Sequence, residues 1–320
     1  MKPYVYVTRK LPESVIDPLR EDFKVEMWDR EDAPVPRNIL LDKAEKASAL
    51  LTMLSDKVDR ELLQRASSLK VVSNLAVGYD NIDVEAAKEK GITITNTPDV
   101  LTETTADLTF ALLMAVARRV VEADRYIKEG NWKSWSPLLL AGTDIHHKTM
   151  GIVGMGSIGE AVARRAKGFN MDVLYYNRSR KPEAETGIGV RYAPFEELLA
   201  QSDFVVILAP LSPDTEGMFQ EEQFKIMKDT SMLINAARGP IVNEDALVQA
   251  LKRGDIRGAG LDVFEIEPIS KDHPLLKFDR VVALPHIGSS SQDTRNNMMT
   301  LCVENIKAVL NGDGPKTAVK

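Results

Sequence analysis

The sequence predicts an α/β protein built from two Rossmann-like domains, each a doubly wound parallel sheet. Three observations support this fold class. Short β-branched runs alternate with helix-like segments, the alternation occurs twice along the chain, and a glycine-rich loop follows the first run of the second set. Alternation of this kind places helices on both faces of a parallel sheet. A chain of 320 residues is long for one core and sufficient for two domains.

The first predicted sheet consists of four runs rich in β-branched residues, YVYVT, ALLTML, KVVSNLA and GITITNT, at 4–8, 49–54, 70–76 and 91–97. Amphipathic segments such as DRELLQRAS and NIDVEAAKEKG lie between these runs and predict helices. The second sheet follows with five runs at 149–154, 171–176, 203–208, 231–236 and 280–285. In NEDALVQALKRG, Asn243 can cap a helix that Gly254 ends, because these residues favour the two helix termini.

The connection between the two sets starts with a long helical segment near Thr102 and continues as an irregular stretch, 130–147. A final helix is predicted from about Ser291 to Leu310. We expect this helix to pack back on the first domain, an expectation that rests partly on the resemblance given below. The predicted domains are therefore 1–100 with 288–320 for substrate and 101–287 for a dinucleotide.

Composition excludes several classes of protein. The net charge of −6 and the scattered basic residues argue against nucleic acid as the main partner. The single cysteine, Cys302, allows no internal disulfide and no cysteine-based zinc site, which fits a reducing cytoplasm, and we assign no metal ligands. The N-terminus lacks the apolar run of an export signal. The longest apolar stretch, 106–121, is interrupted by charges and is too short to span a membrane.

The segment GIVGMGSIG carries Gly154, Gly156 and Gly159 in the G-x-G-x-x-G spacing, between a β-like run and the helical EAVARRAKGF. Such glycines allow a tight turn, close approach to a pyrophosphate and close helix–strand packing. The phosphates would lie at the helix N-terminus, near Ser157 and Ile158, where free N–H groups favour anions. Methyltransferases and purely structural turns share the pattern, so the strand before it and the helix after it are needed for the interpretation.

The stretch YYNRSRK, 175–181, has no acidic residue where dinucleotide-binding folds usually place one. Asn177 would remove the repulsion of a 2′-phosphate that an acid exerts. Arg178 and Arg180 could pair with this phosphate, and Ser179 could donate a further hydrogen bond. We therefore favour NADPH, with NADH as a possible alternative; mixed use of both cofactors and a merely solvated loop are the competing interpretations.

Three charged residues follow predicted strand ends of the second set: Arg238 in NAARG, Glu267 in LDVFEIEP and His286 in LPHIGS. Ligands of open α/β sheets collect at this edge. His286 could protonate a carbonyl oxygen near neutral pH, and a hydrogen bond from its imidazole to Glu267 would favour the protonated imidazole. Arg238 could bind a carboxylate and polarise the carbonyl. Each residue alone is more often structural, and Glu265 competes with Glu267.

The chain resembles the D-isomer-specific 2-hydroxyacid dehydrogenases, and within them the glyoxylate/hydroxypyruvate reductases. The motifs that carry the resemblance cover nearly the whole chain: NLAVGYDNID, NTPDVLTETTADL, GIVGMGSIG, NAARGPIVNEDAL, GAGLDVFEIEP and LPHIGS. The resemblance implies the trio Arg238, Glu267 and His286, with Glu267 preferred over Glu265 because it occupies the E-P position. It also implies an active site in the cleft between the two domains.

The resemblance implies further site residues that composition does not reveal. Backbone N–H groups of Val77, Gly78 and Tyr79 would hold the substrate carboxylate, Asp262 would bind the nicotinamide carboxamide, and Thr105 would lie near the nicotinamide. Residues expected near the substrate are Ser289, Met53, Leu54 and Trp135. The assignment of cofactor-binding residues also includes Pro210 and Ala236.

The resemblance further implies a homodimer joined through the nucleotide-binding domains. EGNWKSWSPLLLAG adds two tryptophans and three leucines in a region without clear periodicity. Such an apolar arm needs cover, which a partner subunit could supply, and Trp135 could then reach the neighbouring active site. An arm folded onto its own domain is the alternative.

The predicted function is NADPH-preferring reduction of glyoxylate, hydroxypyruvate or a related 2-keto acid to the D-2-hydroxy acid, with no nucleic acid or membrane as a partner. A 2-ketogluconate reductase would use the same scaffold with a different pocket size. A formate dehydrogenase fits less well, because that branch pairs its histidine with glutamine. A dinucleotide-sensing regulator is the alternative from a different class, although the sequence shows no basic tail or recognition segment.

Overall fold

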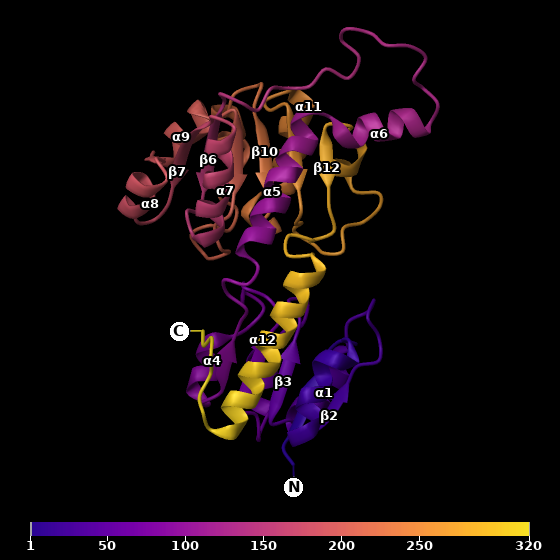
Figure 1. Ribbon diagram of the computed structural model, residues 1–320, viewed down its shortest axis with the longest axis vertical. Coiled ribbons are helices and arrows are strands. Elements are labelled where there is room, and N and C mark those ends of the chain that lie inside the picture. The colour runs from indigo at the N-terminus through magenta and orange to yellow at the C-terminus, as the bar shows by residue number, and fades with distance from the viewer. Residues whose placement is uncertain (1, 320) are drawn as a thin grey trace. The chain divides into compact units, whose positions relative to one another are not determined.

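The computed structural model describes residues 2–319, which form two compact units. One unit holds Met1–Leu101 and Ser291–Lys320, and the other holds Thr102–Ser290. Each unit contains its own sheet, and all strand pairs within the two sheets are parallel (Figure 1). The predicted fold class, two α/β domains with parallel sheets, is therefore confirmed.

The first unit has a five-stranded sheet in the order β2-β1-β3-β4-β5. Its strands are β1 (Tyr4–Val7), β2 (Lys24–Met27), β3 (Ala49–Thr52), β4 (Val71–Asn74) and β5 (Thr93–Thr95). Buried side chains of α2 (Arg37–Lys46), α3 (Arg60–Arg65) and α4 (Val84–Glu89) share one core with residues of the sheet, including Val72. The neighbouring Ser73 points to the other face, where its hydroxyl donates to the Cys302 carbonyl of α12 (Gln292–Asn311). α12 packs there with α1 (Glu13–Asp22).

The second unit has a seven-stranded sheet in the order β12-β11-β10-β9-β6-β7-β8. The strand order reverses between β6 and β9, which is where doubly wound sheets bind ligands. The strands of this sheet are β6 (Thr149–Val153), β7 (Asp172–Tyr176), β8 (Arg191–Tyr192), β9 (Phe204–Ile207), β10 (Met232–Asn235), β11 (Gly258–Leu261) and β12 (Val281–Ala283).

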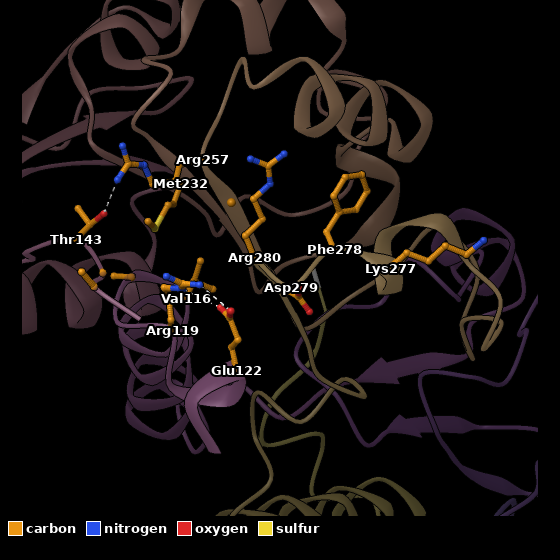
Figure 2. Close-up of a pocket in the computed structure, with 14 residues that line it drawn as sticks. Val116, Arg119, Glu122, Thr143, Met232, Arg257, Lys277, Phe278, Asp279 and Arg280 are labelled. Atoms are coloured by element: carbon orange, nitrogen blue, oxygen red, sulfur yellow. Dashed lines mark hydrogen bonds and ion pairs between the residues drawn. The ribbon is translucent and has the colours of Figure 1, made fainter. Parts of the chain in front are cut away.

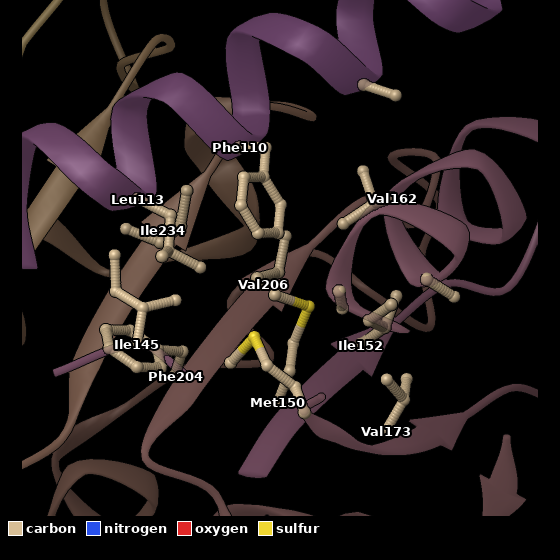
Figure 3. Packing of buried hydrophobic residues seen from close by; sticks show 14 of the residues in the cluster. Phe110, Leu113, Ile145, Met150, Ile152, Val162, Val173, Phe204, Val206 and Ile234 are labelled. Atoms are coloured by element: carbon tan, nitrogen blue, oxygen red, sulfur yellow. The ribbon is translucent and has the colours of Figure 1, made fainter. Parts of the chain in front are cut away.

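Helices cover both faces of the second sheet. α5 (Thr102–Ala117) and α7 (Ser157–Gly168) share one core with it, in which Phe110 and Leu113 of α5 lie near Ile234 of β10 (Figure 3). α9 (Phe195–Gln201), α10 (Glu221–Ile226) and α11 (Glu244–Arg253) contribute buried side chains to a second core. α8 (Pro182–Gly187) precedes β8, and two short 3₁₀ turns lie at Gly239–Ile241 and Pro274–Lys277.

The local signals at helix ends are confirmed where they were clearest. Asn243 accepts a hydrogen bond from the Ala246 N–H at the start of α11, and Gly254 ends this helix with a φ of +81°. The long helix expected from Thr102 is instead divided, because Arg119 adopts a φ of +54° between α5 and α6 (Val120–Lys128). Within the described residues, no helix has the length and apolar character needed to cross a membrane.

Candidate functional site

Most of the predicted site residues of the second unit follow the carboxyl ends of its strands. Because parallel strands end at the same edge of a sheet, their loops meet there. The glycine loop follows β6, and Asn177 follows the adjacent strand β7. The remaining strand-end residues are Pro210 after β9, Ala236 and Arg238 after β10, Asp262 after β11 and His286 after β12.

The three glycines of the loop after β6 occupy different surroundings. Gly154 has a φ of +104°, and a Cβ there would lie 2.4 Å from the Ala209 nitrogen. A Cβ on Gly159 would lie 2.3 Å from the Gly154 carbonyl oxygen, whereas a Cβ on Gly156 would meet no heavy atom within 4 Å. Two glycines are thus required by the fold. The third leaves open space at the start of α7, which fits a pyrophosphate at a helix N-terminus.

The loop after β7 is tied to the glycine loop. The Asn177 side-chain oxygen accepts from the Met155 N–H at 3.1 Å, and the Asn177 amide donates to the Ser179 carbonyl at 3.3 Å. Arg178, Ser179 and Arg180 are exposed. The Arg180 guanidinium pairs with Glu185 of α8, at 2.6 Å between Nη2 and Oε2. Of the two arginines, Arg180 is therefore already engaged by the protein.

His286 and Glu267 form the central pair of the site. Nδ1 of His286 lies 2.7 Å from Oε2 of Glu267, and the other oxygen of Glu267 accepts from the Phe264 N–H at 3.0 Å. Burial raises the pKa of Glu267, but the hydrogen bond and charge of His286 outweigh this effect, and the net pKa lies below its usual value. An ionised Glu267 only accepts, so Nδ1 carries the proton and Nε2 remains for a substrate.

Arg238 is brought to this pair by the loop after β10. The buried Asn235 shapes the loop, because its amide donates to the Arg238 carbonyl at 2.9 Å and its oxygen accepts from the Ala237 N–H at 3.1 Å. A Cβ on Gly239 would lie 1.8 Å from the Phe264 carbonyl carbon, so the loops after β10 and β11 touch. The positive charge of Arg238 further lowers the pKa of Glu267. The three predicted residues thus lie in one group.

Glu265, the competitor of Glu267, has a different partner. Its side chain accepts from the Glu244 N–H at 3.0 Å, and the Glu244 side chain accepts from the Glu265 N–H at 2.9 Å. This reciprocal pair joins the loop after β11 to the start of α11. Glu265 is therefore held away from His286, and Glu267 is the carboxylate that meets it.

Asp262 anchors the backbone beside His286. One carboxylate oxygen accepts from Ile287 N–H and the other from Gly288 N–H, both at 2.8 Å. Burial raises the pKa of Asp262. The buried Thr105 lies next to this turn, because a Cβ on Gly288 would come within 3.4 Å of its methyl carbon. Asp262 and Thr105 are therefore neighbours, and Ser289 follows directly.

The predicted residues of the first unit follow β3 and β4. Met53 and Leu54 come after β3, and Val77, Gly78 and Tyr79 come after β4. In the second unit, Trp135 lies apart from the strand ends, in the segment between α6 and β6, with 78% of its surface exposed.

Sequence reasoning missed the polar side chains that connect these two loops. The Asn81 amide donates to the Met53 carbonyl at 3.3 Å and to the Asp56 carbonyl at 2.9 Å. The Asn74 amide donates to the Gly78 carbonyl at 3.1 Å. The only available signal was an asparagine at each end of NLAVGYDN, which alone indicates no role.

A cavity of about 480 Å³ lies at the amino ends of strands of the second sheet (Figure 2). It is bordered by the first residues of β10 and β11, by Arg280 before β12, and by Gly142 and Thr143. Figure 2 shows Arg119 of this cavity paired with Glu122. Because this is the amino edge of the strands, the cavity is separate from the group around His286. Among the described residues, no cluster of His, Cys, Asp and Glu side chains could hold a metal ion.

Comparison with known proteins places this arrangement in a family. The model of the "D-isomer specific 2-hydroxyacid dehydrogenase, NAD binding domain" matches residues 110–288, more than half of the chain. A glyoxylate reductase of Korarchaeum cryptofilum is 50% identical over 320 residues, which cover 100% of this chain and 96% of the relative.

Solved structures show the same similarity. A protein of Thermus thermophilus is 45% identical with a TM-score of 0.93, covering 99% of this chain and 100% of that one. An NADPH-dependent glyoxylate/hydroxypyruvate reductase of Sinorhizobium meliloti, solved in complex with NADP and malonate, is 34% identical with a TM-score of 0.85, covering 100% of this chain and 97% of that one.

Proposed function

Because the chain belongs to the D-isomer specific 2-hydroxyacid dehydrogenases and is therefore an oxidoreductase, we propose that it reduces glyoxylate and hydroxypyruvate to the corresponding 2-hydroxy acids. The product has the D configuration where it is chiral. The observation that carries the proposal is the 2.7 Å pair of His286 and Glu267 beside Arg238. The name of the Korarchaeum relative, a glyoxylate reductase, supports the substrate.

Each residue of the group has a role in this reaction. A reduced nicotinamide cofactor supplies a hydride when bound. His286 donates a proton from Nε2 to the carbonyl oxygen as negative charge develops there, and Glu267 keeps the imidazole oriented through its Nδ1. Arg238 binds the keto acid and polarises its carbonyl. The carbonyl group thus becomes a hydroxyl group, because the hydride adds to its carbon and the proton to its oxygen.

The two units divide these tasks in the proposal. The second unit binds the dinucleotide through the glycine loop, Ser157 and Ile158, with Asp262 and Thr105 near the nicotinamide. Pro210 and Ala236, at the ends of β9 and β10, add to the wall of this site. The first unit binds the substrate, its carboxylate held by N–H groups of Val77, Gly78 and Tyr79 and its body by Met53 and Leu54.

Turnover tests the reaction. Purified protein with NADPH or NADH should oxidise the cofactor in the presence of glyoxylate or hydroxypyruvate, followed by the loss of cofactor absorbance, with 2-ketogluconate as a third substrate. His286→Ala should lower kcat by about 10²- to 10⁴-fold while the cofactor still binds. No oxidation of either cofactor across a panel of 2-keto acids would refute the reductase, and unchanged turnover of the variant would refute the role of His286.

We further propose that NADPH is preferred over NADH. The loop after β7 presents Arg178 and Arg180 without an acid, and the Sinorhizobium relative is described as NADPH-dependent. Arg178 is exposed and, among the described residues, has no ion pair, so its whole guanidinium is available to a 2′-phosphate. Arg178→Ala should raise KM for NADPH by about tenfold and leave KM for NADH nearly unchanged. Equal changes in both constants would contradict the preference.

We also propose that the protein assembles as a homodimer through α6 and the segment that follows it. Among the described residues α6 buries no side chain, and it exposes Val121 and Ile127 by 53% and 58%. Trp135 and Leu138 continue this apolar surface with 78% and 81% exposed. A surface of this kind marks an interface. Ile127→Asp with Leu138→Asp should convert a dimer to a monomer in light scattering, and a wild-type monomer would refute the proposal.

A further inference from the structure

A buried tyrosine forms hydrogen bonds at the end of the loop that carries Arg178 and Arg180. Tyr175, the fourth residue of β7, is fully buried, and its hydroxyl donates to Oε1 of Glu185 at 2.6 Å. The same hydroxyl accepts from the Lys181 N–H at 2.7 Å. One phenol oxygen thus fastens both the end of the loop and a carboxylate of α8.

Glu185 in turn holds Arg180 along one edge. Oε1 of Glu185 accepts from Nε of Arg180 at 3.1 Å, and Oε2 accepts from Nη2 at 2.6 Å. This two-point pairing leaves Nη1 outside it. The guanidinium carbon also lies 5.5 Å from the centre of the Tyr192 ring, whose edge-on contact with Tyr175 spans 5.6 Å. The plane of the guanidinium is therefore constrained by an ion pair and by an aromatic ring.

The ion pair itself is too exposed to matter much for folding. The Arg180 side chain is 62% exposed, and pairs at such positions contribute little to stability. What the pairing does change is the freedom of Arg180, whose long side chain would otherwise have to be ordered when a ligand binds. The consequence of the network is thus pre-organisation of one cation in the loop.

We propose that Glu185, supported by Tyr175 and Tyr192, is a positioning residue that presents Arg180 to the 2′-phosphate of NADPH. This inference rests on the proposed preference for NADPH. Glu185 also carries a negative charge, which by itself repels a phosphate. Positioning and repulsion therefore predict opposite effects when the charge is removed, and the sign of the effect decides between them.

The test compares Glu185→Gln with a matched control, Glu183→Gln. Glu183 lies on the same short helix and loses the same charge, but it is exposed, and among the described residues the ion pair of Arg180 is with Glu185. Steady-state KM is measured for NADPH and NADH, and binding of adenosine 2′,5′-bisphosphate is compared with that of 5′-AMP by calorimetry. Glu185→Gln should weaken the binding of NADPH and of the bisphosphate by about three- to tenfold and leave the binding of NADH and 5′-AMP unchanged. Glu183→Gln should change none of these.

Tyr175→Phe is a second variant that tests the network. A double-mutant cycle then shows whether Glu185 acts through Arg180. Loss of the Tyr175 hydroxyl should weaken NADPH binding and leave NADH binding unchanged. The effect should be smaller than that of Glu185→Gln, because the ion pair between Glu185 and Arg180 remains. In an Arg180→Ala background, Glu185→Gln should have no further effect on the ratio of the two cofactor constants. Tighter NADPH binding by Glu185→Gln, or an unchanged ratio, would overturn the positioning role.

The same panel separates this inference from the function it rests on. If Arg180→Ala lowers selectivity for NADPH and Glu185→Gln does not, the positioning role alone fails. If neither arginine variant changes selectivity, the preference for NADPH fails with it. Turnover of glyoxylate with NADH reports the reductase activity independently of both.

Discussion

Alanine substitutions at Gly156 and Gly159 should separate cofactor binding from folding, although both glycines belong to one loop. At Gly156 the backbone is extended, with φ of −88° and ψ of −168°, and a Cβ meets no heavy atom within 4 Å. Gly156→Ala should therefore leave the melting temperature within about 2 °C of the wild type. A methyl group would, however, occupy the space proposed for the pyrophosphate. Loss of charge-assisted hydrogen bonds of about 1.5–3 kcal/mol corresponds to about 10- to 150-fold weaker dinucleotide binding.

Gly159→Ala should show the reverse pattern. Its Cβ would lie 2.3 Å from the Gly154 carbonyl oxygen, and a backbone oxygen cannot move without displacing the loop. Overpacking of this kind costs about 1–3 kcal/mol, or about 2–12 °C in melting temperature for a domain of this size. Thermal melts and quenching of intrinsic fluorescence by NADPH measure both quantities. Wild-type NADPH affinity in a folded Gly156→Ala protein would refute the placement of the phosphates.

Three other substitutions test the group around His286 and the loops of the first unit. Glu267 has a pKa below its usual value of 4.5, so its ionised form stabilises the fold above that pH, and this contribution is lost as pH falls. In urea melts, the difference in unfolding free energy between the wild type and Glu267→Gln should therefore shrink below about pH 4.5. A difference that stays constant with pH would contradict this. Asp262→Asn places an amide donor against the Ile287 or Gly288 N–H and should cost about 1–3 kcal/mol of unfolding free energy, measured in the same melts. Asn81→Ala should raise KM for the keto acid several-fold with KM for NADPH unchanged, and equal changes would refute its role in positioning the loops.

Much of the fold was predictable because its signals are local. The strands β1, β3, β4, β5, β6, β7, β9, β10 and β12 lie within the predicted runs of β-branched and other apolar residues, which favour strands whatever lies around them. Three strands lie outside those runs: β2 is KVEM, with two charged residues, β8 has only two residues, and β11 is GAGL, with two glycines. β2 and β8 are edge strands and β11 lies between β10 and β12, so in all three strands pairing with neighbours replaces intrinsic preference.

The break between α5 and α6 was missed for a related reason. No glycine or proline marks it, and Arg119 reaches the left-handed region with its guanidinium bound to Glu122 at 2.7 and 2.8 Å. The helix ends there although its sequence would allow it to continue. A contact between side chains three residues apart thus accompanies a change in direction that residue preferences do not indicate.

In the candidate site, the sequence likewise indicates which residue types are present but not how they are arranged in space. Arg238, Glu267 and His286 are recognisable because each follows a strand. Their approach depends on contacts that no motif encodes, such as the backbone of Gly239 lying against Phe264.

Cofactor recognition shows how far this dependence extends. The arginines of YYNRSRK are visible in the sequence, but the residue that restrains Arg180 lies five positions further on, in α8, and is itself held by the hydroxyl of a buried tyrosine. A loop with the same arginines and no such support would have to order both side chains when it binds. Selectivity for a 2′-phosphate should therefore depend on residues outside the loop as well as on the charges within it.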